Sequence, residues 1–476
     1  ADMNRFPTAL LLTLCCGVAA AQESSLGSDW PWFLGPDHTG VAAETEILEA
    51  WPESGPKLLW ELKLGSGYSA PSIRGDRIVV HHRLGDKEIV QCIDSKTQKK
   101  LWGYAVDSDY SDPYGYSNGP RCTPILTEDK CFTLGAGGHL ACVDLSTGKK
   151  IWSRDLQKDY EIPRNFFGIG CTPVLEGDKL IVLAVGPPNS GVAAFDSKTG
   201  KPLWSSVGKD TWDGAARPKR GAYEWSGEEM LVSYSSPIAA TINGKRHLLC
   251  LMRQGLVSLD PDTGKTRFKY WFRSPVHESA NAARPVVIGN KVLISAAYRM
   301  GSVLLQVNDD GNGVSELWKN QRNLLAHWST PIVVGDHAYG FSGRHESEGE
   351  LRCIDLETGK VSWSTTGYDP EVMGRIVVDN EKRAYVSEKT GKVVPRPVFG
   401  RGSKILVGDK FIILGERGLL ALAKVNSKSY EEISRAEYRQ IGNQAWTAPV
   451  LSRGRLYLRR EKQLLCLDIA PKKADQ

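Results

Sequence analysis

Aromatic and basic side chains recur at one position of a repeated pattern, and their types suit them to hold a ligand. Three residues before a recurring proline, or before its degenerate equivalent, stand Tyr68, Arg121, Tyr234, Trp328, Arg401 and Trp446. Gly170 and Ala282 occupy the same position in the two remaining copies. Aromatic faces stack on rings and guanidinium groups attract anions, so this position predicts a platform for a planar, sugar-like or anionic ligand. The alternative interpretation is that these side chains only fill the mouth of a channel.

Two further side chains, Trp225 and His327, lie in the loops next to this position and are included in the candidate ligand site. Catalytic residues remain unknown, because no Ser/His/Asp order can be argued from a single sequence. His81 and His82 are neighbours in an expected strand, so their rings point to opposite faces and do not share a metal. His, Cys and carboxylate residues show no zinc-type spacing, and we expect no metal site.

The elements that position the candidate residues belong to an internal repeat. Each full copy runs from small residues and a proline, through a Gly-Asp-type turn, to an aspartate, a Thr-Gly-Lys turn and a tryptophan four residues after the turn glycine. Full copies end at Trp152, Trp204 and Trp363, and degenerate copies fill the gaps between them. Thr-Gly suits a tight hairpin turn, alternation marks the strands, and tryptophan suits the wedge between neighbouring sheets.

The copies number eight, and the last one stops at Asp468 without its fourth strand. Residues 55–60 have the pattern of a fourth strand, but no first three strands of a repeat precede them. We therefore expect an all-β, eight-bladed β-propeller over residues 56–470, closed by an N-terminal strand that completes the last blade. Its short turns should lie on one face. The long loops at 103–120, 153–169, 205–233 and 364–400 should lie on the other, where binding is expected.

The N-terminal residues predict where the protein is located, and its net charge excludes one class of partner. Residues 1–21 have a basic start, a short apolar run and an Ala-rich end, which indicate a signal peptide, with lipid attachment at Cys15 or Cys16 as the less favoured alternative. Residues 22–55 form an N-terminal extension and 471–476 a C-terminal tail. The net charge of +5 comes without a basic arm, so no nucleic-acid partner is expected. We expect an exported monomer, periplasmic or secreted, without a transmembrane segment.

Eight of the ten cysteines follow the expected signal peptide. Cys92, Cys142, Cys353 and Cys466 occupy one repeat position and Cys122 and Cys171 another, which favours buried free thiols. A bridge between Cys122 and Cys171 stays open.

The repeat resembles the PQQ-binding-like repeats of the quinoprotein alcohol dehydrogenase-like superfamily. The motifs that carry this resemblance are Asp29-Trp30-Pro31-Trp32-Phe33, Tyr234-Ser235-Ser236-Pro237, Trp446-Thr447-Ala448-Pro449 and Leu465-Cys466-Leu467-Asp468. The layout is similar to exported planctomycete-type propellers, and the group is related to the propeller subunit of the outer-membrane β-barrel assembly machine.

The repeat architecture, the aromatic and arginine residues at the axial position and the resemblance together leave three functions open. The first is a scaffold that binds an unknown protein or other ligand at its loop-rich axial face. The second is an alcohol or sugar dehydrogenase that uses pyrroloquinoline quinone with calcium. The third is a carbohydrate-binding module. Quinoprotein dehydrogenases stack the quinone between a tryptophan and a vicinal disulfide, and here the only adjacent cysteines are Cys15 and Cys16. No cofactor is therefore firmly implied, and enzyme activity stays open.

Overall fold

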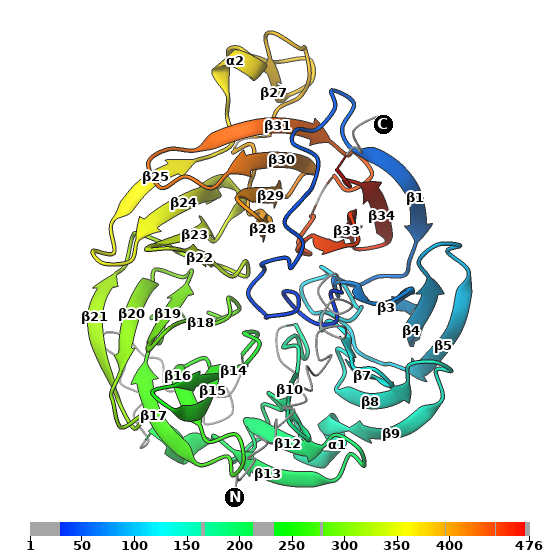
Figure 1. Cartoon of the computed structure of the whole chain (residues 1–476), viewed down its shortest axis with the longest axis vertical. Coiled ribbons are helices and arrows are strands. Elements are labelled where there is room, and N and C mark those ends of the chain that lie inside the picture. The colour runs from blue at the N-terminus through cyan, green and yellow to red at the C-terminus, as the bar shows by residue number, and fades with distance from the viewer. Residues whose placement is uncertain are drawn as a thin grey trace, which may run out of the picture.

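The structure, a computed structural model, describes residues 29–471 except 163–166, 213–232, 277–278, 396 and 443. The expected signal peptide and Trp225 lie outside the described residues. In the described part of the chain, eight four-stranded antiparallel sheets form a ring around a central axis (Figure 1). The predicted all-β, eight-bladed propeller is confirmed.

The blades follow one another in chain order, and the first strand of each lies innermost (Figure 1). Blades one and two contain β2 (Ser72–Arg74), β3 (Arg77–Leu84), β4 (Lys87–Asp94), β5 (Lys100–Asp107), β6 (Ile125–Leu126), β7 (Lys130–Leu134), β8 (His139–Asp144) and β9 (Lys150–Asp155). Blades three and four contain β10 (Val174–Glu176), β11 (Lys179–Val182), β12 (Val192–Asp196), β13 (Pro202–Ser206), β14 (Ile238–Ile242), β15 (Lys245–Leu251), β16 (Gly255–Leu259) and β17 (Thr266–Trp271).

The second half of the ring repeats this order. Blades five and six contain β18 (Val286–Ile288), β19 (Lys291–Ala296), β20 (Gly301–Val307), β21 (Val314–Asn320), β22 (Ile332–Val334), β23 (His337–Ser342), β24 (Glu350–Asp355) and β25 (Val361–Thr365). Blades seven and eight contain β28 (Ser403–Val407), β29 (Lys410–Leu414), β30 (Leu419–Lys424), β31 (Glu431–Glu437), β32 (Val450–Ser452), β33 (Arg455–Arg460), β34 (Gln463–Asp468) and β1 (Lys57–Lys63).

The N-terminal strand closes the ring as the sequence predicts. β1 pairs antiparallel with β34, from Lys57 opposite Asp468 to Lys63 opposite Gln463. Trp60 and Leu62 of this strand pack on the core of the last blade. The pairing covers the outer edge of β34, which would otherwise offer unpaired amides and carbonyls to other chains.

Each Thr-Gly turn is held by the aspartate that precedes it. In the second blade, Asp144 Oδ1 accepts hydrogen bonds from the backbone of Ser146 (3.0 Å) and Thr147 (2.8 Å), and from both hydroxyl groups. These hydrogen bonds, mainly those from the two hydroxyls, lower the pKa of Asp144 to about 2. The aspartate therefore caps the backbone amides of the turn.

The tryptophan of one blade packs on the turn glycine of the next. Trp152 Nε1 donates to the carbonyl of Ser197 (3.0 Å), and a Cβ added to Gly200 would lie 2.6 Å from the Trp152 ring. Trp102 with Gly148, Trp204 with Gly264 and Trp318 with Gly359 repeat the contact. The glycine is therefore needed for close approach as well as for its positive φ of +70°.

Gly200→Ala is expected to lower the free energy of unfolding by more than Gly177→Ala does. Both glycines have positive φ, but a Cβ at Gly177 meets no atom within 4 Å. The control, Gly177→Ala, should lower the free energy of unfolding by about 1 kcal/mol, because alanine is strained in the left-handed backbone conformation. Gly200→Ala should cost roughly 1–3 kcal/mol more, because the added methyl displaces the tryptophan. Urea unfolding measures both, and equal losses would contradict this account of the contact.

Hydrogen bonds between first strands join neighbouring blades near the axis. The backbone N–H of Thr123 donates to Thr172 Oγ1 (3.0 Å), and that of Thr172 donates to Ser236 Oγ (2.9 Å). Arg284 N donates to Thr330 Oγ1 in the same way (3.1 Å). These residues directly precede the repeat proline, so the small hydroxyl side chains at this position link one blade to the next.

Residues 29–51 run across the centre of the ring (Figure 1). Trp30 forms a β-bridge with Ile73 in blade one, and Val41 pairs with Leu406 in blade seven. Asp29 forms an ion pair with Arg453 and accepts from Gly75 N (3.0 Å), and Glu44 accepts from Gly454 N (2.7 Å). These partners lie in the short strand-one to strand-two turns, so the segment closes the face with short turns. The sequence predicts only an extension here.

The insertion between blades six and seven contains regular secondary structure, whereas the sequence predicts only a long loop there. It holds helix α2 (Pro370–Met373) and the two-stranded sheet β26 (Ile376–Asp379) and β27 (Ala384–Ser387), which project from the rim (Figure 1). The other short helical elements are α1 (Leu156–Tyr160) and 3₁₀ turns at Lys209–Trp212 and Glu346–Glu348. Among the described residues, no helix is long and apolar enough to cross a membrane. The eight described cysteines are buried and free, Cys122 and Cys171 included.

Candidate functional site

A cavity of about 380 Å³ lies on the propeller axis. Trp30, Phe33 and Leu34 of the N-terminal segment line it on the side with short turns. Tyr114 and Tyr116 line it on the opposite side, where they are 45% and 44% exposed. The cavity is therefore closed toward the short turns and open toward the long loops.

All eight equivalent repeat positions line this cavity. They are Tyr68, Arg121, Gly170, Tyr234, Ala282, Trp328, Arg401 and Trp446. His327 lines it as well, so the structure brings together seven of the eight residues chosen from the sequence. The eighth, Trp225, lies outside the described residues.

The aromatic rings form a connected belt around the cavity. The Trp446 ring centroid lies 5.1 Å from that of Tyr68, 5.5 Å from that of Trp328 and 5.5 Å from that of Tyr116. On the other side, the Tyr234 ring lies 5.4 Å from Phe167. Rings that support one another in tilted and edge contacts are held in place before a ligand arrives.

Arg401 is held by a buried carboxylate behind the cavity wall. Its guanidinium binds both oxygens of Glu416, which is 2% exposed, and its Nε lies 3.1 Å from Glu416 Oε2. Glu416 Oε1 also accepts from Trp446 Nε1 (2.7 Å). The Arg401 guanidinium carbon lies 4.8 Å from the Trp328 ring centroid and 5.4 Å from that of Trp446. Glu416 therefore orients a cation and an aromatic side chain of the site together.

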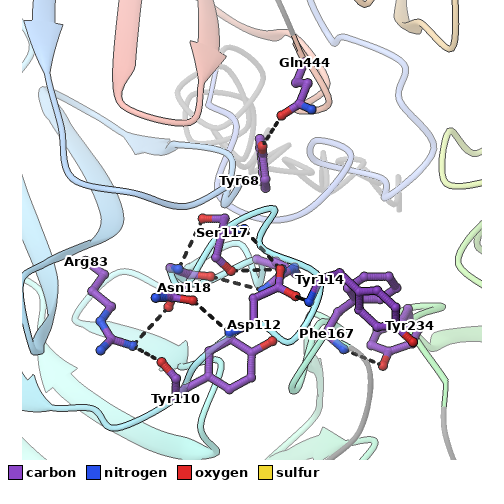
Figure 2. Close-up of polar contacts among 12 residues, drawn as sticks. Tyr68, Arg83, Tyr110, Asp112, Tyr114, Ser117, Asn118, Phe167, Tyr234 and Gln444 are labelled. Carbon is purple, nitrogen blue, oxygen red and sulfur yellow. Dashed lines mark hydrogen bonds and ion pairs between the residues drawn. The ribbon is translucent and has the colours of Figure 1, made fainter.

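Arg121 is likewise held by a carboxylate, that of Asp112. Asp112 also binds Tyr114, Ser117 and Asn118 of the loop after blade one (Figure 2). Asp112 Oδ2 accepts from Arg121 (2.9 Å) and from Ser117 N (3.1 Å), and its Oδ1 accepts from Tyr114 N (2.9 Å). Asp112 N donates to Asn118 Oδ1 (2.8 Å). The same carboxylate thus fixes the arginine and the backbone that carries the exposed Tyr114.

His327 stands in the wall as a neutral ring. Burial, and then the nearby charges of Arg401 and Arg344, lower the pKa of His327 to about 3. Its Nε2 lies 3.2 Å from Tyr298 Oη, and the Arg344 guanidinium lies 4.5 Å from the Tyr298 ring centroid. At neutral pH the positive charge on this side of the cavity therefore comes from arginine.

Several residues of this site are not identified by the sequence reasoning. Tyr116, Tyr298 and Arg344 line the cavity from loops that have no repeat register, and Asp112 and Glu416 lie behind it. Tyr116 and Asp112 lie in the long loop 103–120 that the sequence assigns to the binding face. Tyr298, Arg344 and Glu416 lie in shorter connections between second and third strands, for which the sequence gives no signal. The N-terminal Trp30 and Phe33 have no repeat signal at all.

The charged groups that line the cavity are of one sign. Arg121, Arg344 and Arg401 line it, whereas no carboxylate, carboxamide or cysteine does among the described residues. No group of three or more His, Cys, Asp or Glu side chains within the described ranges gathers to hold a metal ion. The arrangement can stack a ring against aromatic faces and attract an anionic group.

Comparisons with known proteins agree with this fold. A family model described as outer membrane protein assembly factor BamB matches residues 86–365. No curated protein sequence matches the chain. BamB from Moraxella catarrhalis is 13% identical with a TM-score of 0.55, and the match covers 88% of this chain and 99% of that one.

Two redox enzymes are similar in structure as well. Quinohemoprotein alcohol dehydrogenase from Comamonas testosteroni is 13% identical with a TM-score of 0.60, covering 96% of this chain and 82% of that one. A europium-containing methanol dehydrogenase is 12% identical with a TM-score of 0.58, covering 93% and 89%. At these identities the similarity concerns the fold alone.

Proposed function

The chain belongs to the family of the outer membrane protein assembly factor BamB, and from that premise we propose that it is an exported binding protein that holds a ring-shaped ligand in its axial cavity. The observation that carries the proposal is the convergence of eight equivalent positions, six of them aromatic or arginine, on one cavity. Apolar cavities with a few converging polar groups are the usual form of a ligand site. The expected signal peptide supports export.

Preorganisation of the wall supports binding. Glu416 and Asp112 hold Arg401 and Arg121 from behind, and the aromatic belt holds its own rings. Such a site loses little side-chain entropy when a ligand enters, so more of the contact free energy appears as affinity. A channel that was merely filled would not need charged groups oriented by buried carboxylates, each of which is costly to desolvate.

A calcium-bound quinone does not fit the described lining residues. In the dehydrogenases that the repeat resembles, calcium takes carboxylate and amide oxygens and the quinone stacks on a vicinal disulfide. Here no such side chain lines the cavity among the described residues, and the two carboxylates behind its wall, Asp112 and Glu416, are bound by arginines. The donor set thus favours a binding protein over a quinone-dependent alcohol or sugar dehydrogenase.

A second candidate function is docking of a protein partner on the loop-rich face. Tyr114 and Tyr116 are exposed at the rim of the cavity, and exposed aromatic side chains over a structured surface are frequent anchors of protein interfaces. The family match supports this candidate because the assembly factor named in it works on proteins. The two functions are compatible, since a partner could insert a side chain or a glycan into the same cavity.

A thermal-shift screen of ring-shaped compounds tests the first function. The compounds are neutral and acidic sugars, aromatic acids and pyrroloquinoline quinone with calcium. We expect at least one to raise the melting temperature of the full chain, because a ligand that binds only the folded state stabilises it. The shift should be lost in Trp446→Ala, which removes the ring at the centre of the aromatic belt.

Trp271→Ala is the matched control, because Trp271 is 39% exposed on the outer strand β17, away from the cavity lining. This variant should keep the ligand-induced shift. A screen without any stabilising compound would contradict the proposal, and so would a shift of equal size in Trp446→Ala. Tight quinone binding with dye reduction by alcohols would instead establish the dehydrogenase.

A further inference from the structure

We infer that the ligand of the axial cavity is a sugar ring that carries a carboxylate, and that the guanidinium of Arg344 binds this carboxylate. The inference rests on the proposed function and deepens it. It follows from how the three arginines of the wall are paired and from which neutral groups line the inner part of the cavity.

Two of the three arginines already have a carboxylate partner. Arg121 pairs with Asp112, whose side chain is fully buried, and Arg401 pairs with Glu416. Each pair is close to neutral as a unit, and each arginine is held against the wall by its partner. Arg121 and Arg401 therefore contribute more to the shape of the cavity than to its net positive charge.

Arg344 differs, because it makes no ion pair with any described residue. The two nearest acids in the chain are engaged elsewhere. Glu346 binds Arg417 through both oxygens (2.6 and 2.7 Å), and Glu348 Oε2 accepts from the backbone N–H groups of Arg344 (2.9 Å) and His345 (3.2 Å). The guanidinium of Arg344 stacks on the Tyr298 ring instead (4.5 Å). Among the residues that the structure describes, the cavity wall thus keeps one positive charge without a carboxylate partner.

An uncompensated cation next to aromatic surface favours a ligand with one anionic group. Water screens the charge less inside a cavity than at an open surface, so an anion that enters gains more from it. Guanidinium binds carboxylate through two parallel hydrogen bonds, and with five N–H donors Arg344 can form them beside its contacts with the ring and the hydroxyl of Tyr298. A neutral ring would leave this charge without a partner.

The remaining polar groups favour a hydroxylated ring over a plain aromatic acid. Thr123, Thr172, Ser236 and Thr447 line the cavity. Thr172 and Ser236 each accept a hydrogen bond from a neighbouring blade, and a hydroxyl that accepts can still donate its own proton. Hydroxyl groups of a sugar can accept those protons, while its C–H face stacks on Trp446 or Trp328.

Calorimetric titration of the full chain tests the inference with two matched disaccharides, one ending in glucuronic acid and one ending in glucose. The acidic sugar should bind about tenfold more tightly at low salt, the usual size of a charge-assisted hydrogen bond. In Arg344→Gln the two sugars should bind equally, because only the acidic one loses affinity. Arg344→Lys should restore part of the preference. Arg246→Gln, which removes an arginine paired with Glu176 outside the cavity, should leave it unchanged.

Equal binding of both sugars by the unaltered protein would overturn the inference, and so would a preference that survives in Arg344→Gln. If both sugars bind equally and Trp446→Ala abolishes binding, the inference fails while the proposed function stands. If neither sugar binds, the inference fails as well. The proposed function then depends on the ligand screen, in which aromatic acids and neutral rings are separate arms.

Discussion

A chain that begins at Leu64 is expected to be recovered as insoluble protein, whereas a chain that begins at Pro52 remains folded. The two differ by β1, which forms the outer strand of the last blade and pairs with β34 along its length. Without β1, the edge of β34 is exposed together with the buried leucines at 464, 465 and 467. A long apolar edge of this kind recruits other chains.

The chain from Pro52 is the matched control because it lacks the segment 29–51 but keeps β1. It loses Trp30 and Trp51 from the core, so its melting temperature should fall, but its ring stays closed. Soluble yield, circular dichroism and thermal melting distinguish the two chains. A soluble chain from Leu64 with an unchanged melting temperature would show that closure by β1 does not hold the ring together.

The repeat made the fold predictable, because its residues have the same geometric role in each blade that keeps them. The turn aspartate binds turn amides, the turn glycine lets a tryptophan of the preceding blade approach, and the small residue before the proline links first strands. Even a degenerate copy kept the register. Lys404 stands in the proline position of blade seven, yet Arg401, three residues before it, still lines the cavity.

The parts of the site that the sequence did not predict come from segments without a repeat. Arg344, Tyr116 and Glu416 lie in loops of individual length, so no register relates them to the axis. The segment 29–51 contains tryptophans and prolines but no periodicity, and its path across the channel depends on contacts with several blades. Such contacts are long-range, and a local pattern does not contain them.

Glu416→Ala is expected to lower the free energy of unfolding by about 3 kcal/mol, because it leaves the guanidinium of Arg401 partly buried without its counter-charge. Arg401 is only 19% exposed and Glu416 is 2% exposed, so water replaces little of the lost interaction. The substitution also removes the acceptor of Trp446 Nε1. Binding in the axial cavity should weaken at the same time, since Arg401 and Trp446 both lose their orientation.

Glu346→Ala is the matched control, because it also breaks an ion pair with an arginine but does so at a more exposed position. Glu346 forms a bidentate pair with Arg417, but the two side chains are 30% and 42% exposed, and such pairs contribute about 0–1 kcal/mol. Urea unfolding of both variants gives the comparison. In the double variant Arg401→Met with Glu416→Leu, much of the stability should return, because no lone charge stays buried. Equal losses for Glu416→Ala and Glu346→Ala would mean that water reaches Arg401 freely, and the wall of the cavity would then be less rigid than its hydrogen bonds indicate.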